Sequence, residues 1–170
     1  HQFLGIIAGF AITGIIQSSS ASMGMLIALA SQGLIPLSSA LPILYGDNIG
    51  TCVTSLLSSI GASRNAKRAA TMHLTFNVIG TLIFVLILNY PISALVKWLD
   101  PTDAARQIAN AHTIFNVVNV LILLPFAKSI VKIVLKIMPI TEEDSEATAA
   151  TKYLDERIIK TPSIALGNTV

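Results

Sequence analysis

Apolar residues dominate the first part of the chain, and polar residues interrupt them in a regular way. The apolar stretch 3–16 ends at the run Gln-Ser-Ser-Ser (17–20), and a second short apolar stretch follows over 21–31. As a helix the first stretch rises about 21 Å, and spanning the hydrocarbon core takes roughly 20 residues. Two short helices that meet at a polar break predict a discontinuous or re-entrant element, which lines a cavity or is buried in protein.

The same pattern then occurs a second time. An apolar stretch over 36–45 leads to Gly-Asp-Asn-Ile-Gly-Thr (46–51), where we expect a second break, and another short apolar stretch follows over 52–60. Two broken elements so close together resemble the unwound helices of secondary transporters. Asp47 is the only charged side chain before Arg64. At a turn it would either bind a cation or face water.

Two longer apolar stretches, 69–89 and 107–126, are each long enough to cross a bilayer. Of the 170 residues, 53% are hydrophobic and 12% are charged, against about a quarter charged in a soluble domain. The sequence therefore predicts an all-α membrane protein, a polytopic helical bundle with re-entrant or broken helices. It shows neither metal-ligand spacing of Cys and His nor a phosphate-binding Gly-rich loop.

The two long stretches share the pattern His-x-x-Phe-Asn, at His73 and Asn77 in one and at His112 and Asn116 in the other. Residues four apart lie on the same face of a helix, so each stretch presents one polar pair. We favour a structural role for these pairs, in hydrogen bonds between helices, over direct contact with a substrate.

Basic residues predict the orientation of the chain. They gather in the loop 64–68 and in a stripe formed by Lys128, Lys132 and Lys136, which indicates a helix end or an interfacial helix. By the positive-inside rule both lie in the cytoplasm, with two spans between them. We therefore expect a multi-pass protein of the inner or plasma membrane with a cytoplasmic C-terminal tail. No basic patch of the nucleic-acid-binding type is present, so no nucleic acid partner is expected.

The serine run could bind either sign of charge. Ser18, Ser19 and Ser20 offer hydroxyl donors beside the free N–H groups of a helix start, which suits an oxyanion. The same hydroxyls and the Gln17 carbonyl oxygen could also bind a hard cation, and Asn48 and Thr51 would add further oxygens. The simpler alternative is a serine-lined contact between helices.

A remote alternative is an intramembrane serine protease built from a serine of 18–20, His73 and Asp47. A serine nucleophile needs a base within hydrogen-bond reach. The Gly-x-Ser-x-Gly context of a nucleophile elbow is absent. We therefore do not expect an enzyme.

Taken together, the Gln-Ser-Ser-Ser run (17–20), the Asn-Ile-Gly-Thr run (48–51) and the two His-x-x-Phe-Asn patterns resemble the type II sodium/phosphate cotransporter family, over residues 1–138. That family has two inverted repeats, and one Gln-Ser-Ser-Ser copy is present here. The resemblance implies that the chain is one half of an inverted-repeat transporter, whose partner is the missing N-terminal repeat of the same protein.

The resemblance also implies a site and a mechanism. Phosphate would be bound by Ser18, Ser19, Ser20 and Thr51, and Na⁺ by Gln17, Ser18, Asn48 and Thr51. The function implied is sodium-coupled transport of inorganic phosphate by alternating access, with Na⁺ as the coupling ion and no organic cofactor. A phosphate exporter or a phosphate-sensing regulatory membrane protein is the alternative, and homo-oligomerisation is left open.

Beyond the membrane region we expect two further segments. An acidic linker would occupy 139–151, and 152–170 would begin a truncated cytoplasmic PhoU-like helical domain, as in bacterial members of that family.

Overall fold

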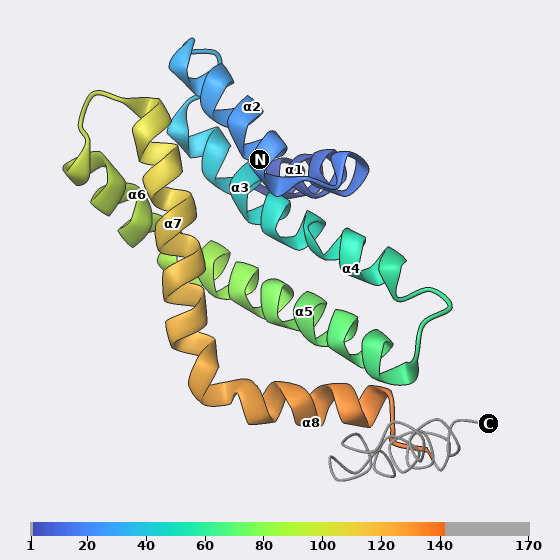
Figure 1. Cartoon of the computed structure of the whole chain (residues 1–170). Helices are drawn as coiled ribbons and strands as arrows, with labels where there is room; N and C mark the ends of the chain where they lie inside the picture. The colour runs from blue at the N-terminus through green and yellow to red at the C-terminus, as the bar shows by residue number, and fades with distance from the viewer. Residues whose placement is uncertain (1, 142–170) are drawn as a thin grey trace, which may run out of the picture. The chain divides into compact units, whose positions relative to one another are not determined.

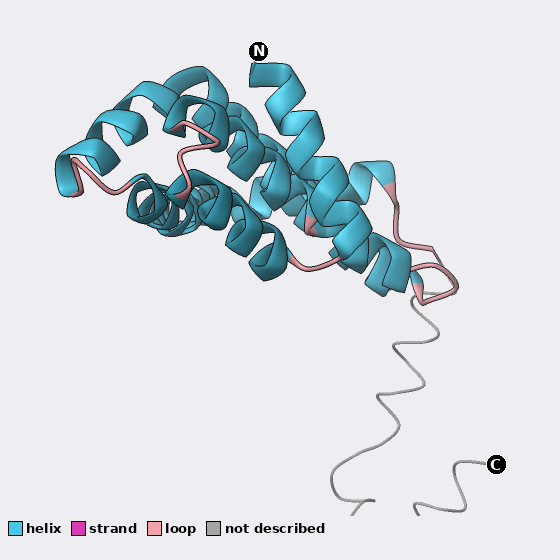
Figure 2. Cartoon of the chain, turned by 90° about the horizontal axis from the view of Figure 1, so that it is seen from above, coloured by secondary structure: helices cyan, strands magenta, loops and turns pink. Residues whose placement is uncertain are grey.

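The computed structural model describes residues 2–141, and the elements of this range are helices joined by short loops (Figure 2). The all-helical prediction is therefore confirmed for these residues. Residues 1–134 form one compact unit. The elements, in order, are α1 (Gln2–Ile16), α2 (Ser19–Ser31), α3 (Leu37–Gly50), α4 (Cys52–Ser58), α5 (Arg64–Ile83), the π-helical turn η1 (Phe84–Leu88), α6 (Asn89–Leu99), α7 (Ala104–Leu123), the 3₁₀ turn η2 (Leu124–Phe126) and α8 (Ala127–Ile137). The tail predicted over 152–170, and all but the first residues of the predicted linker, lie outside the described range.

The break predicted at the serine run is present between α1 and α2. Gln17 has a φ of 57°, in the left-handed region, and its N–H donates to the Thr13 carbonyl oxygen at 2.7 Å. Ser18 is extended and caps α2, since its hydroxyl oxygen accepts from the Ala21 N–H at 3.3 Å. A polar cap after a left-handed residue ends one helix and starts the next.

The second predicted break is wrong in its position. α3 continues through the glycines to Gly50, and only Thr51 separates it from α4. The glycines serve helix packing here, because a Cβ at Gly46 would overlap the backbone carbonyl of Ile6 in α1. Asp47 consequently does not face water at a turn. It lies inside α3 and is 1% exposed.

Two continuous helical stretches are long and apolar enough to cross a membrane, judged by length and composition. They run over Arg64–Leu99, 36 residues, and Ala104–Ile137, 34 residues. Both extend past the predicted spans 69–89 and 107–126, because the chain stays helical through η1 and η2. α4 and α5 lie side by side, joined by the loop that follows Ser58 (Figure 1).

An aromatic cluster joins α3 to the two long stretches. The rings of Phe84 and Phe115 have their centroids 4.4 Å apart, and Tyr45 from α3 lies 5.6 Å from Phe115. All three side chains are buried. The Thr81 hydroxyl also donates to the Tyr45 carbonyl oxygen at 3.3 Å. This cluster fixes α3 between α5 and α7. Along α3, Tyr45 comes shortly before Asn48 and Thr51, which line the site.

Candidate functional site

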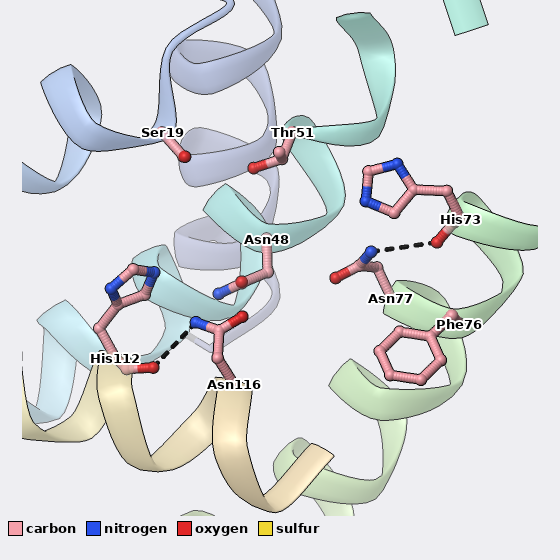
Figure 3. A pocket seen from close by; sticks show the side chains of 8 residues that line it. All are labelled: Ser19, Asn48, Thr51, His73, Phe76, Asn77, His112 and Asn116. Carbon is pink, nitrogen blue, oxygen red and sulfur yellow. Dashed lines mark hydrogen bonds between the residues drawn. The ribbon is translucent and has the colours of Figure 1, made fainter. Parts of the chain in front are cut away.

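A polar cavity of about 360 Å³ lies where α2, α3, α5 and α7 meet (Figure 3). It gathers residues far apart in the sequence, among them most of those predicted from the motifs. It is lined by Ser19, Asn48, Thr51, His73, Phe76, Asn77, His112 and Asn116. Both His-x-x-Phe-Asn pairs therefore face the same space as the serine run and the Asn-Ile-Gly-Thr run.

Only one residue of the Gln-Ser-Ser-Ser run lines the cavity. Ser19 is the first helical residue of α2, and the first N–H groups of a helix have no partner inside it. Ser18 acts as the cap, and its hydroxyl lies 3.2 Å from that of Ser20. Gln17 and Ser20 are exposed at the break. The start of α2 thus offers a hydroxyl and the positive end of the helix dipole to an anion.

The Asn-Ile-Gly-Thr run contributes its first and last residues. The Asn48 side-chain amide donates to the Leu44 carbonyl oxygen at 2.9 Å, within α3. The Thr51 hydroxyl donates to the Asp47 carbonyl oxygen at 3.0 Å. Both bonds hold the side chains against α3 while they border the cavity.

The paired residues of α5 and α7 make similar bonds along their own helices. Asn77 donates to the His73 carbonyl oxygen at 3.0 Å, and Asn116 donates to that of His112 at 2.9 Å. His73 also reaches another helix, since its Nδ1 lies 3.1 Å from the Ser55 hydroxyl of α4. This contact pairs His73 with Ser55 rather than with the serine run.

A second polar cluster joins α1, α2 and α3 beside the break. The Thr13 hydroxyl donates to Asp47 Oδ1 and lies 2.9 Å from the Ser22 hydroxyl. All three side chains are at most 5% exposed, and Asp47 Oδ2 has no hydrogen-bond partner. No role was predicted for Thr13 or Ser22 from the sequence. The available signal was the isolated charge of Asp47, which at membrane depth requires polar partners from neighbouring helices.

The polar groups that line the cavity are hydroxyls, amides and the imidazoles of His73 and His112. Among the described residues no group of three His, Cys, Asp or Glu side chains could hold a metal ion. Oxygen ligands of the kind that line the cavity suit hard cations, and a helix start suits anions. This cavity is bordered by two helical stretches that are long and apolar enough to cross a membrane.

The chain belongs to the Na⁺/Pi-cotransporter family, whose model matches residues 1–127. The family predicted from the motifs is thereby confirmed, and with it a membrane setting. The chain is 33% identical to the Bacillus subtilis protein YqeW over 134 residues, 79% of this chain and 43% of that protein. No solved structure matches the chain.

Mammalian relatives match a shorter part. The chain is 36% identical over 87 residues to the rat sodium-dependent phosphate transport protein 2A. This match covers 48% of this chain and 14% of that protein. It is 35% identical over 89 residues to the human sodium-dependent phosphate transport protein 2C, 50% of this chain and 15% of that protein. The chain thus spans less than half the length of these relatives.

Proposed function

We propose that the full-length protein carries out sodium-coupled transport of inorganic phosphate, and that this chain supplies one half of its binding site. One observation carries the proposal: a single cavity brings the start of α2 together with the amide side chains of α3, α5 and α7. An anion and a cation could therefore be bound side by side. Relatives named for sodium-dependent phosphate transport support the choice of both.

Phosphate binds at the start of α2. The Ser19 hydroxyl and the N–H groups of Ser19 and Ser20 donate to its oxygens. The Ser18 cap, which accepts from the Ala21 N–H, holds that turn in place. The Thr51 hydroxyl borders the same space. Gln17 and Ser20, exposed at the break, contact the substrate from the side that the other repeat completes.

The remaining features follow the family resemblance. The described helices form one polytopic half of an inverted-repeat transporter, with α1 and α2 as the two arms of a re-entrant element. Transport proceeds by alternating access around a site near the middle of the membrane. The basic residues of 64–68, which begin α5 instead of forming the predicted loop, lie in the cytoplasm together with the lysines of α8. A cytoplasmic tail leads through the linker 139–151 into the start of a PhoU-like domain over 152–170.

Replacing Ser19 by alanine tests the phosphate site. In proteoliposomes of the full-length protein we expect Ser19→Ala to raise the half-saturating phosphate concentration roughly tenfold to a hundredfold, since a hydrogen bond to a charged group contributes about 1.5–3 kcal/mol. The measurement is sodium-dependent uptake of ³²P-phosphate. Ser31→Ala is the matched control, because Ser31 lies at the other end of α2 and donates to the Ala28 carbonyl oxygen. Equal affinities in Ser19→Ala and the control would exclude Ser19 as a phosphate ligand.

A further inference from the structure

We infer that the side-chain oxygens of Asn48, Asn77 and Asn116 form a cation subsite inside the cavity, and that its ligand is Na⁺. This inference rests on the proposed function for the identity of the ion. It adds Asn77 and Asn116 to the sodium ligands that the sequence predicted, and it gives the two His-x-x-Phe-Asn patterns a direct role in binding.

The hydrogen bonds of the three amides fix their orientation. Each NH₂ group donates to the carbonyl oxygen four residues earlier in its own helix, at 2.9 Å for Asn48, 3.0 Å for Asn77 and 2.9 Å for Asn116. The opposite orientation would place two oxygens against each other, which amide side chains avoid. The amide nitrogens therefore face their helices, and the oxygens face away.

The three oxygens remain available to a ligand. Within the described part of the chain none of them accepts a hydrogen bond. Asn48 and Asn77 are 6% and 8% exposed, yet the only buried polar side-chain atom without a partner in that part is Asp47 Oδ2. Their oxygens must therefore border open space. Figure 3 shows the side chains of Asn48, Asn77 and Asn116 converging on one region of the cavity.

Oxygens of this kind select a cation. An amide carbonyl oxygen is a hard, neutral ligand, and rings of carbonyl oxygens replace the hydration shell of alkali ions in membrane proteins. Three neutral oxygens fit a monovalent ion. A cation here would attract an anion held at Ser19, so each ion would raise the affinity for the other.

The test measures sodium binding without phosphate. The full-length protein in detergent is titrated with NaCl at constant ionic strength, with choline chloride as the balancing salt, and the melting temperature is followed. For Asn77→Ala and Asn116→Ala we expect the half-saturating Na⁺ concentration to rise about tenfold, the loss of one good ligand. Asn116 is exposed on α7, so Asn116→Ala should fold normally. This variant can therefore test the subsite even if Asn77→Ala fails to fold.

Two threonines provide matched controls. Thr75 and Thr113 lie on the same helices and donate to the carbonyl oxygen four residues earlier, at 2.8 Å and 3.1 Å, and neither lines the cavity. Thr75→Ala and Thr113→Ala are expected to keep the wild-type sodium dependence. If the asparagine variants behave as these controls do, the cation subsite is excluded. Equal stabilisation of the wild type by KCl would exclude sodium as its selective ligand.

The outcome separates this inference from the proposed function. Wild-type protein that is stabilised by Na⁺ but takes up no ³²P-phosphate would contradict the transport proposal, while loss of that stabilisation in the asparagine variants would still support the subsite. Sodium-driven phosphate uptake with unchanged sodium dependence in both asparagine variants would support transport and overturn the subsite.

Discussion

Gly46→Ala is expected to destabilise the full-length protein by about 3 kcal/mol or more, at the upper end of what overpacking costs. A Cβ at Gly46 would overlap the carbonyl oxygen of Ile6, and a Cβ at Gly9 would overlap that of Ile43. A glycine of each helix therefore lies directly against the backbone of the other, and the two backbones are in contact. Neither neighbour is a flexible side chain, so the helices themselves would have to separate. Thermal unfolding in detergent measures the loss.

Gly24→Ala provides the control. Gly24 lies inside α2, and a Cβ there meets no atom within 4 Å. Alanine has the higher helix propensity, so this change should be neutral or should stabilise by up to about 1 kcal/mol. Equal losses in Gly46→Ala and Gly24→Ala would contradict the close packing of α1 on α3.

The close approach of α1 and α3 also matters for function. Small residues let membrane helices pack closely where apolar burial alone provides no driving force. Here they bring the break at Gln17 and Ser18 beside the end of α3, where Asn48 and Thr51 border the cavity. A Gly46→Ala protein that still folds should therefore bind phosphate more weakly, because the start of α2 would move relative to α3.

The sequence predicted the first break but misplaced the second, because only the first is determined by its local residues. Four consecutive polar residues in an apolar stretch (17–20) have no good place on a lipid-facing helix, so that break can be predicted locally. Gly46 and Gly50 are ambiguous, because glycine serves equally in a turn and at a close helix contact. The choice depends on α1 lying against α3, which is a tertiary contact that the local pattern does not contain.

The candidate site shows the same division. Asn48, Asn77 and Asn116 were noticed because each belongs to a sequence motif, and all three line one cavity. Their orientation depends on hydrogen bonds to Leu44, His73 and His112, which require the helices to be known first. Thr13 escaped prediction because an isolated hydroxyl in an apolar helix carries no signal until Asp47 and Ser22 are placed beside it.

Thr13→Val is expected to lower the free energy of unfolding by about 2–4 kcal/mol, because it removes a hydroxyl that donates to the buried side chain of Asp47. The substitution keeps the shape of the side chain and deletes the hydrogen bond. Thr54→Val is the control: Thr54 is exposed in α4, and its replacement should change stability by no more than about 0.5 kcal/mol. Thermal or denaturant unfolding of the full-length protein in detergent gives both values.

The pairing of Thr13 with Asp47 is tested by combining the two changes. Asp47→Asn keeps an oxygen that can accept from Thr13 and buries no charge. Alone, it should therefore lower the free energy of unfolding by less than Thr13→Val does. In the Asp47→Asn background Thr13→Val should lower stability by about 1 kcal/mol less than in the wild type, the difference between a hydrogen bond to a charged acceptor and one to a neutral acceptor. Strictly additive effects would contradict a charge-assisted bond from Thr13 to Asp47. The Thr13 carbonyl oxygen also accepts from the Gln17 N–H. Thr13→Val should therefore weaken phosphate binding as well, because it shifts the break between α1 and α2 and not because it removes a residue that lines the cavity.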